Sequence, residues 1–441
     1  MIGAAVRSTL KTTAALAVLQ VALPLNLLWT AGALVRPRSM QAVLPEAGER
    51  RTILISGGKM TKALALARAF HNAGHRVVLV EAAKYRFTGH RFSFAVAKFY
   101  TVPAPTDPRY ADALLQIVRA EKVDVYIPVC APAASYPDAM AGELLAPYCE
   151  VVHGTPAQIM ALDDKFEFSA MAREAGVRVP ECFRITSEQQ LRDFDFGSGQ
   201  TSYVLKNLAY DPVNRLDLTR LPTPDESTLD AFLAGKTISA ENPWILQEFI
   251  PGREYCTHGT VRAGRVQVYC CCPSSAFQIN YESVDKPRIQ EWVTTFVAHH
   301  ELTGQMSFDF IESSRDGSIY AIECNPRTHS AITMFYDQSE QLAGAYLQDD
   351  HPLVTPTPAS KPTYWIYHEV WRLLTGYGPV RERLRVIAEG KDAIFDVADP
   401  MPFLLVHHLQ IPSLLLTNLV TCKEWIKVDF NIGKIVQAAG D

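Results

Sequence analysis

The chain has 441 residues, of which 48% are hydrophobic and 20% are charged. This balance is typical of a globular protein with room for two or three domains, and it excludes disordered, collagen-like and coiled-coil chains. Lysine and arginine number 42 against 47 aspartate and glutamate residues, which gives a net charge of −5. Because there is no basic excess and no long basic run, we expect no nucleic-acid partner.

Residues 12–35, TTAALAVLQVALPLNLLWTAGALV, carry no formal charge. A helix of this length spans a hydrocarbon core at about 1.5 Å per residue. Arg7 and Lys11 precede the segment and Arg36 and Arg38 follow it, so the flanking charges do not indicate an orientation. The first interpretation is a membrane anchor. A helix that lies in the interface or is buried, and a cleaved export signal, are the alternatives.

The nine cysteines are an odd number, form no C-x-x-C pair, and include three consecutive residues, Cys270, Cys271 and Cys272. Consecutive side chains on a strand point to alternating faces, which suits neither a disulfide framework nor a zinc site. Reduced thiols in the cytoplasm are therefore the simpler interpretation.

Residues 51–153 are predicted to form a parallel α/β domain. TILISG, HRVVLVEA and VDVYIPVCA have the apolar runs of buried strands, and the segments between them have the apolar spacing of helices. This alternation favours a parallel sheet with helices on both faces. The turn after the first strand, S-G-G-K at residues 56–59, departs from G-x-G-x-x-G, so a tight turn is favoured over a dinucleotide site.

From residue 154 onward strands and helices stop alternating, which favours an α+β arrangement. We expect one subdomain over 154–246 and a second over 247–347, with an apolar helix and linker at 1–50. The segment ALDDKFEFSAMAREAG is predicted to be one helix with Asp163 or Asp164 near its start. Residues 348–441 are predicted to be a linker and apolar helices, which pack on the other domains or make a second membrane contact.

The hairpin formed by QMSFDFIE and SIYAIECN carries the most informative polar residues. Glu323 and Asn325 are two residues apart on a strand, so their side chains share a face. A three-residue loop, Arg315 to Gly317, places Asp309 opposite Glu323, whereas a two-residue turn aims it at the other face. Two carboxylates and an amide suit Mg²⁺. The alternative is an exposed hairpin whose polar residues face solvent.

Three cationic side chains lie at positions where an anionic ligand would stabilise them. Lys206 lies in the apolar strand VLKN, where an unpaired ammonium is costly to bury unless it reaches water. Lys165 stands near a helix start, where acids are usual, and it either binds an anion or pairs with a neighbouring aspartate. Arg327 follows Asn325 by two residues and brings a bidentate cation toward the same site.

The order of these residues resembles the ATP-grasp superfamily of ligases, over about residues 51–345: Lys165, Lys206, then Q-E-F-I-P-G-R-E at 247–254, Asp309, and E-x-N-x-R at 323–327. Those enzymes join an acid to an amine through an acyl phosphate. The resemblance implies ATP and two Mg²⁺ ions as cofactors. It assigns the ATP phosphates to Lys165 and Lys206, the nucleoside to Gln247, Glu248, Phe249, Ile250 and Glu254, the metal ions to Asp309, Glu323 and Asn325, and catalysis to Arg327 and Lys206.

One segment departs from the family pattern. Many members close a glycine-rich loop over the phosphates, but Lys206 is followed here by NLAYDPVNRLDLTR, without glycine. Asn214 or Arg215 is the candidate to replace backbone amides there.

Segments such as SGGKMTKALALARAFHNAGHRVVLVE and AIECNPRTHSAITMFY look more narrowly like the cyanobacterial-type ligases that make mycosporine-glycine. This likeness implies 4-deoxygadusol and glycine as substrates, phosphorylation of an enol oxygen, and cysteines that are bystanders. Its substrate-side candidates are Ser274, Phe277, Gln278, Asn280 and His329, with packing in the smaller domain as the alternative role. The alternative functions are ligation of another acid and amine, or nucleotide binding by a membrane-tethered protein without turnover.

An enzyme that consumes ATP and has reduced thiols should work in the cytoplasm. Residues 12–35 are then expected to be a cytosol-facing tether, or a helix packed on the C-terminal apolar region, rather than an export signal.

Overall fold

The structure, a computed structural model, describes residues 2–36, 50–129, 131–197, 201–208, 217–274, 280–421 and 423–437. Its first sheet is parallel and has the strand order β3-β2-β1-β4-β5, which confirms the predicted parallel sheet. The strands are β1 (Thr52–Ile55), β2 (Arg76–Ala82), β3 (Lys98–Val102), β4 (Val125–Ile127) and β5 (Glu150–Val151). The connecting helices are α2 (Thr61–Asn72), η1 (Ala83–Tyr85), η2 (Gly89–Phe92), α3 (Tyr110–Glu121), η3 (Pro132–Ala134) and α4 (Ser135–Leu145).

The S-G-G-K segment is a tight turn. Gly57 has φ +70°, and a Cβ there would lie 2.0 Å from the carbonyl oxygen of Val129, so a side chain cannot be accommodated. The Gly58 N–H donates to the Val80 carbonyl at 3.0 Å. The glycines are thus explained by packing between β1 and its neighbours.

The boundaries predicted for the helix at residues 161–176 are wrong. Two helices replace it, α5 (Pro156–Asp163) and α6 (Lys165–Glu174). Asp164 between them has ψ 114°, and its carboxylate accepts hydrogen bonds from the N–H groups of Phe166 (2.8 Å) and Glu167 (3.1 Å). An aspartate that satisfies the first free amides is a strong helix start, so Lys165 becomes the first residue of α6.

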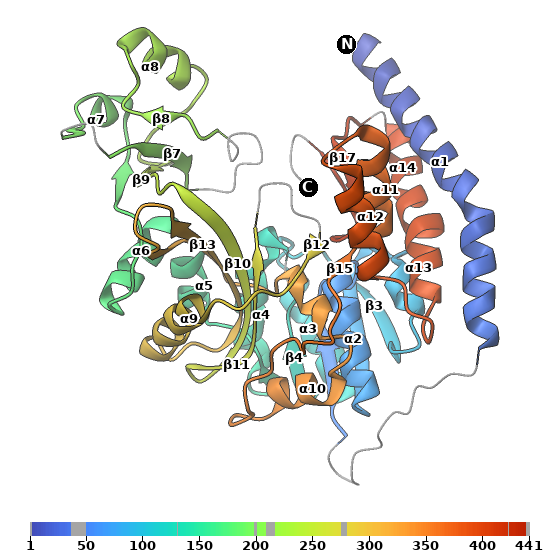
Figure 1. The fold of residues 1–441 in the computed structure, drawn as a ribbon. Coiled ribbons are helices and arrows are strands. Elements are labelled where there is room, and N and C mark those ends of the chain that lie inside the picture. Colours follow the sequence, from blue (N-terminus) through green and yellow to red (C-terminus); the bar gives the residue numbers. More distant parts are fainter. Residues whose placement is uncertain are drawn as a thin grey trace.

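The second sheet is antiparallel, has the order β6-β9-β7-β8, and forms a lobe at one side of the molecule (Figure 1). Its strands are β6 (Cys182–Ile185), β7 (Tyr203–Asn207), β8 (Arg220–Leu221) and β9 (Trp244–Glu248), with α7 (Glu188–Arg192) and α8 (Glu226–Leu233) beside them. Trp244, Leu205 and Leu246 are buried in its core.

The third sheet is also antiparallel and has the order β11-β10-β13-β14, which confirms the expected α+β arrangement. Its elements are β10 (Gly252–Arg262), β11 (Arg265–Pro273), α9 (Pro287–His299), β13 (Gly304–Ser313) and β14 (Ile319–Asn325). Aromatic rings join α6 and α9 to this sheet: Phe168 lies edge-to-face with Phe296 at 5.5 Å, and Trp292 lies edge-to-face with Phe310 of β13 at 5.2 Å between centroids.

The C-terminal region packs on the first domain. Arg68 Nε donates to Asp399 Oδ2 at 2.9 Å, and the Gly89 N–H donates to Gln410 Oε1 at 2.8 Å. The short strand β12 (Asn280–Tyr281) lies between β11 and α9 in the chain. The elements that follow the third sheet are η5 (Ser330–Phe335), α10 (Ser339–Leu347), β15 (Thr363–Tyr364), α11 (Ile366–Thr375), α12 (Val380–Glu389), β16 (Lys391–Asp392), α13 (Met401–Leu405), the π-helical η6 (Val406–Gln410), α14 (Ile411–Thr421), β17 (Lys427–Asp429) and β18 (Lys434–Val436).

The N-terminal helix α1 (Ile2–Val35) lies lengthwise on this region, on the outer side of α13 and α14 (Figure 1). Lys11 Nζ donates to the carbonyls of Trp425 (2.8 Å) and Ile426 (2.7 Å), and Asn26 Nδ2 donates to the Tyr367 hydroxyl at 2.6 Å. The helices at residues 8–35 and 401–421 are each long and apolar enough to cross a membrane. A signal sequence or the core helix of a soluble protein can have the same length and composition.

Candidate active site

Asp309, Glu323 and Asn325 come together on one face of the third sheet. Asp309 on β13 is the direct cross-strand partner of Glu323 on β14, and Asn325 Nδ2 donates to Asp309 Oδ2 at 3.4 Å. Directly opposed residues of an antiparallel pair share a face. The predicted register is therefore confirmed.

The loop predicted to produce this register is wrong. The Ser313 N–H donates to the Ser318 carbonyl at 2.8 Å, which closes the hairpin around residues 314–317 rather than 315–317. A β-bulge at Asp309 and Phe310 then shifts the pairing by one residue and restores Asp309 to its place opposite Glu323. Hydrophobic alternation does not reveal a bulge. The sequence therefore predicted neither the longer loop nor the bulge that compensates for it.

The electrostatics of the acidic pair suit a bound cation. Burial and the negative charge of Glu323 raise the pKa of Asp309 well above its ordinary value. Burial also opposes ionisation of Glu323, but Lys165, whose Nζ lies 3.3 Å from Glu323 Oε2, and the Asp309 hydrogen bond hold its pKa at about 2. Two neighbouring carboxylates with an amide oxygen beside them are a donor set that fits Mg²⁺.

Lys206 reaches this cluster from the second sheet. Its Nζ donates to Gln247 Oε1 at 3.0 Å, and Gln247 Nε2 donates to the Ile322 carbonyl of β14 at 3.1 Å. Burial lowers the pKa of Lys206, while the negative charges of Glu323 and Asp309 act in the opposite direction. The buried Gln247 side chain therefore links the two sheets and orients Lys206, a contact that the sequence did not indicate.

The nucleoside-side candidates lie where β9 passes into β10. The N–H groups of Glu248 and Phe249 already donate to the carbonyls of Glu181 (2.8 Å) and Ser202 (2.7 Å). Ile250 follows them outside the strand and is buried. The Arg220 guanidinium lies 4.2 Å from the centre of the Phe249 ring, and Glu254 is exposed on β10.

Arg327 is held beside the acidic pair by two anionic or polar groups. Its guanidinium donates to Asn325 Oδ1, and Nη1 lies 3.4 Å from Asp163 Oδ1 at the end of α5. Lys165, Lys206 and Arg327 thus approach Asp309 and Glu323 from three different elements. Such a concentration of cations around carboxylates is the arrangement that phosphate oxygens and a divalent cation would complete.

No family description and no curated protein matches the chain. Solved structures do match it. N5-carboxyaminoimidazole ribonucleotide synthetase in its ADP complex superimposes with a TM-score of 0.55 over 77% of this chain and 87% of its own, at 16% identity. The N5-carboxyaminoimidazole synthetase of Staphylococcus aureus gives 0.54 over 71% and 80%, at 15% identity. L-amino acid ligase from Bacillus licheniformis gives 0.51 over 68% and 75%, at 15% identity.

The chain has the ATP-grasp fold. In this fold the second and third sheets approach each other at Gln247, and the cluster of Lys206, Glu323 and Asp309 lies where they meet.

The substrate-side candidates are only partly described. Phe277 and Gln278, like Asn214 and Arg215 of the expected phosphate lid, lie outside the described residues. Ser274 donates its N–H to the Glu254 carbonyl at 2.9 Å, Asn280 lies on β12, and the His329 ring contacts the edge of Tyr281 at 5.0 Å.

Two residues of this region were not anticipated from the sequence. Cys256 on β10 is the direct partner of Asp309 on its other side, so the thiol stands in the same cross-strand row as the acidic pair. Lys62, from α2 of the first domain, donates to the Thr328 carbonyl at 2.5 Å. Neither carries a sequence signal, because both depend on how separate elements pack together.

Proposed function

We propose that this protein is an ATP- and Mg²⁺-dependent ligase that forms a carbon–nitrogen bond and releases ADP and phosphate. The single observation that carries the proposal is the convergence of Lys165, Lys206 and Arg327 on the Asp309–Glu323 pair within an ATP-grasp fold. A protein that only held a nucleotide would have no need of Arg327 beside the site. The L-amino acid ligase among the structural neighbours supports an amino acid as the amine.

The proposed roles follow from charge and position. Asp309, Glu323 and Asn325 would hold Mg²⁺, and the ion would neutralise phosphate charge. Lys165 and Lys206 would bind phosphate oxygens, and Arg327 would stabilise the transferring group. Gln247, Glu248, Phe249, Ile250 and Glu254 would surround the nucleoside. Positioning and electrostatic stabilisation account for most catalysis of phosphoryl transfer, so no covalent nucleophile of the enzyme is needed.

For the substrates we propose 4-deoxygadusol and glycine, as the sequence resemblance implies. The enol oxygen takes the γ-phosphoryl group of ATP, and ADP leaves. The product is a vinylogous acyl phosphate, which the glycine amine attacks at the carbon that bears the phosphate. Phosphate departs with the former enol oxygen, the amine loses a proton, and mycosporine-glycine, an enaminone, remains. Ser274, Phe277, Gln278, Asn280 and His329 are the proposed contacts for these substrates.

The direct test is an assay of purified protein with ATP, Mg²⁺, 4-deoxygadusol and a panel of amino acids. ADP release and product mass are followed together. We expect a glycine adduct of 4-deoxygadusol with stoichiometric ADP. ADP formation only with a different acid and amine would show that the proposed substrates are wrong and that the ligase assignment is right. No ADP with any pair would indicate a nucleotide-binding protein without turnover.

We further propose that the catalytic domains work in the cytoplasm and attach to a membrane through α1. The side chains of α1 that are buried against the body are Thr12, Leu19, Asn26, Thr30 and Ala33, most of them polar. The exposed ones include Leu10, Val18, Val21, Leu25, Leu28 and Trp29. A helix of a water-soluble surface has the opposite distribution, while polar residues toward protein and apolar residues outward suit lipid.

Contacts along the helix favour attachment in the plane of the membrane over a crossing. Lys11 near one end bonds to Trp425 and Ile426, Asn26 bonds to Tyr367, and Trp29 lies 5.4 Å from the Phe395 ring. A crossing helix would have to give up these contacts or draw the body into hydrocarbon, where its polar groups are costly.

A further inference from the structure

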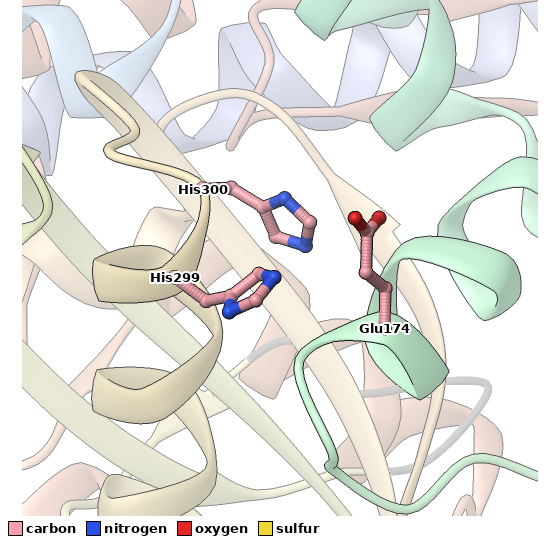
Figure 2. A group of neighbouring side chains, drawn as sticks. All are labelled: Glu174, His299 and His300. Atoms are coloured by element: carbon pink, nitrogen blue, oxygen red, sulfur yellow. The ribbon is translucent and has the colours of Figure 1, made fainter.

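Three side chains with metal-binding groups face one another on the surface, away from the Asp309–Glu323 pair. Glu174 is the last residue of α6, His299 is the last residue of α9, and His300 follows it. Their ligand atoms all lie within 4.8 Å of one another. Figure 2 shows the two imidazole rings and the carboxylate pointing into a common space between the two helices.

The His300 ring is held in place by a backbone hydrogen bond and an aromatic neighbour. Its Nε2 lies 3.0 Å from the Met171 carbonyl oxygen, and because a carbonyl can only accept, Nε2 must carry the proton. In a neutral imidazole the lone pair is then on Nδ1. Metal-binding histidines commonly donate their second nitrogen to a backbone carbonyl in this way. The edge of the Phe296 ring, 5.0 Å away, further restricts the ring.

The Glu174 carboxylate has no charged or hydrogen-bonding partner among the described residues. No lysine or arginine of the described chain forms an ion pair with its carboxylate, and no described group donates a hydrogen bond to it. The His299 ring lies 4.7 Å from the His300 ring between centroids. Glu174 and His299 are exposed, so both side chains can turn toward an ion shared with the fixed His300 ring.

We propose that Glu174, His299 and His300 form a binding site for a first-row divalent cation such as Zn²⁺. Two imidazoles and one carboxylate are a donor set that such ions prefer over Mg²⁺, with water in the remaining position. The ion joins the C-terminal ends of α6 and α9. Because α6 begins at Lys165, whose ammonium contacts Glu323, the site fixes the helix that carries a proposed phosphate ligand.

Calorimetric titration of the chelator-treated full chain tests the site, with Zn²⁺ as the probe and with Mg²⁺ and ADP in excess to fill the proposed active site. We expect one saturable Zn²⁺ site in the natural sequence. His300→Ala and Glu174→Gln should each weaken it at least about tenfold, the loss of one ligand bond. Glu174 is exposed and His300 is partly exposed, so we expect both variants to fold, and circular dichroism checks this.

Glu291→Gln, an exposed acid on the same helix α9, is the matched control and should leave Zn²⁺ affinity unchanged. Co²⁺ gives an independent readout, because thiolate ligands add an intense near-ultraviolet band that nitrogen and oxygen ligands lack. We expect no such band, since the described cysteines are buried. The absence of saturable binding, equal affinity in the His300 and Glu174 variants, or a thiolate band would each overturn the proposal.

Discussion

At the residue scale, the site depends on two neighbouring carboxylates, of which Asp309 has a raised pKa because it is buried and lies beside Glu323. The sequence was sufficient to place Asp309, Glu323 and Asn325 together, because strand alternation fixes which residues share a face. It could not reveal the Gln247 bridge to Lys206 and Ile322 or the row that includes Cys256. Those depend on contacts between strands that are far apart in the chain.

The raised pKa of Asp309 predicts that Mg²⁺ affinity depends on pH. As the pH falls through that pKa the carboxyl takes up a proton, which the ion must displace, so affinity should fall by up to about tenfold per pH unit. Calorimetric titration with Mg²⁺ and ADP between about pH 8 and about pH 5.5 measures this. In Asp309→Asn the binding should be weak and nearly independent of pH. Equal pH dependence in both proteins would contradict the assignment.

Replacing Gln247 by leucine tests whether this residue positions Lys206. The change removes the acceptor of a buried ammonium, which costs about 1–3 kcal/mol, and it leaves the Ile322 carbonyl without its donor. We expect KM for ATP to rise about tenfold with a smaller change in kcat, and Gln247→Glu to restore part of the affinity. If KM for ATP is unchanged in Gln247→Leu, the bridge does not orient Lys206.

At the element scale, the start of α6 decides where Lys165 stands. The sequence predicted a helix across this region but not its interruption, because Asp163 and Asp164 are both suitable caps and only packing selects between them. The observed Asp164 cap makes Lys165 the first helical residue and directs it toward Glu323.

The variant Asp164→Ala is therefore expected to lose both stability and activity. Loss of a helix cap costs about 1 kcal/mol, and Lys165 should become less well placed, so urea unfolding and KM for ATP should both change. Asp225→Ala is the matched control, because Asp225 caps α8 through the Thr228 N–H at 2.8 Å and α8 carries none of the proposed site residues. It should lose similar stability with normal KM. Equal effects of the two variants on KM would contradict a specific role for the α6 cap.

At the scale of the whole molecule, the parallel first domain, the α+β body and the apolar terminal regions were all predictable from periodicity and composition. The packing of α1 along the C-terminal helices was left open, since an uncharged helix of this length suits a bilayer or a protein surface equally. The structure shows the helix on the protein surface (Figure 1), and most of its large apolar side chains are exposed.

Vesicle flotation tests the proposed membrane face. Val21 and Leu28 are 82% and 73% exposed, and the double variant Val21→Lys and Leu28→Lys places two charges where lipid is expected, at about 2.5–3.5 kcal/mol each if fully inserted. We expect binding to be lost while ADP formation continues. Met160→Lys, which charges an exposed apolar position on α5, should still bind. Binding of the double variant at the natural level would show that α1 does not contact lipid.

The proposed mechanism requires that ATP activates an oxygen of the acceptor substrate, which then leaves with phosphate. Turnover of 4-deoxygadusol labelled with ¹⁸O at both the enol and the ketone oxygen, which exchange roles by proton transfer, tests this step. The phosphate released is analysed by mass, and a sample without enzyme corrects for exchange with water. We expect one ¹⁸O atom in each phosphate for every mycosporine-glycine formed. Unlabelled phosphate released together with product would show that ATP does not activate this oxygen.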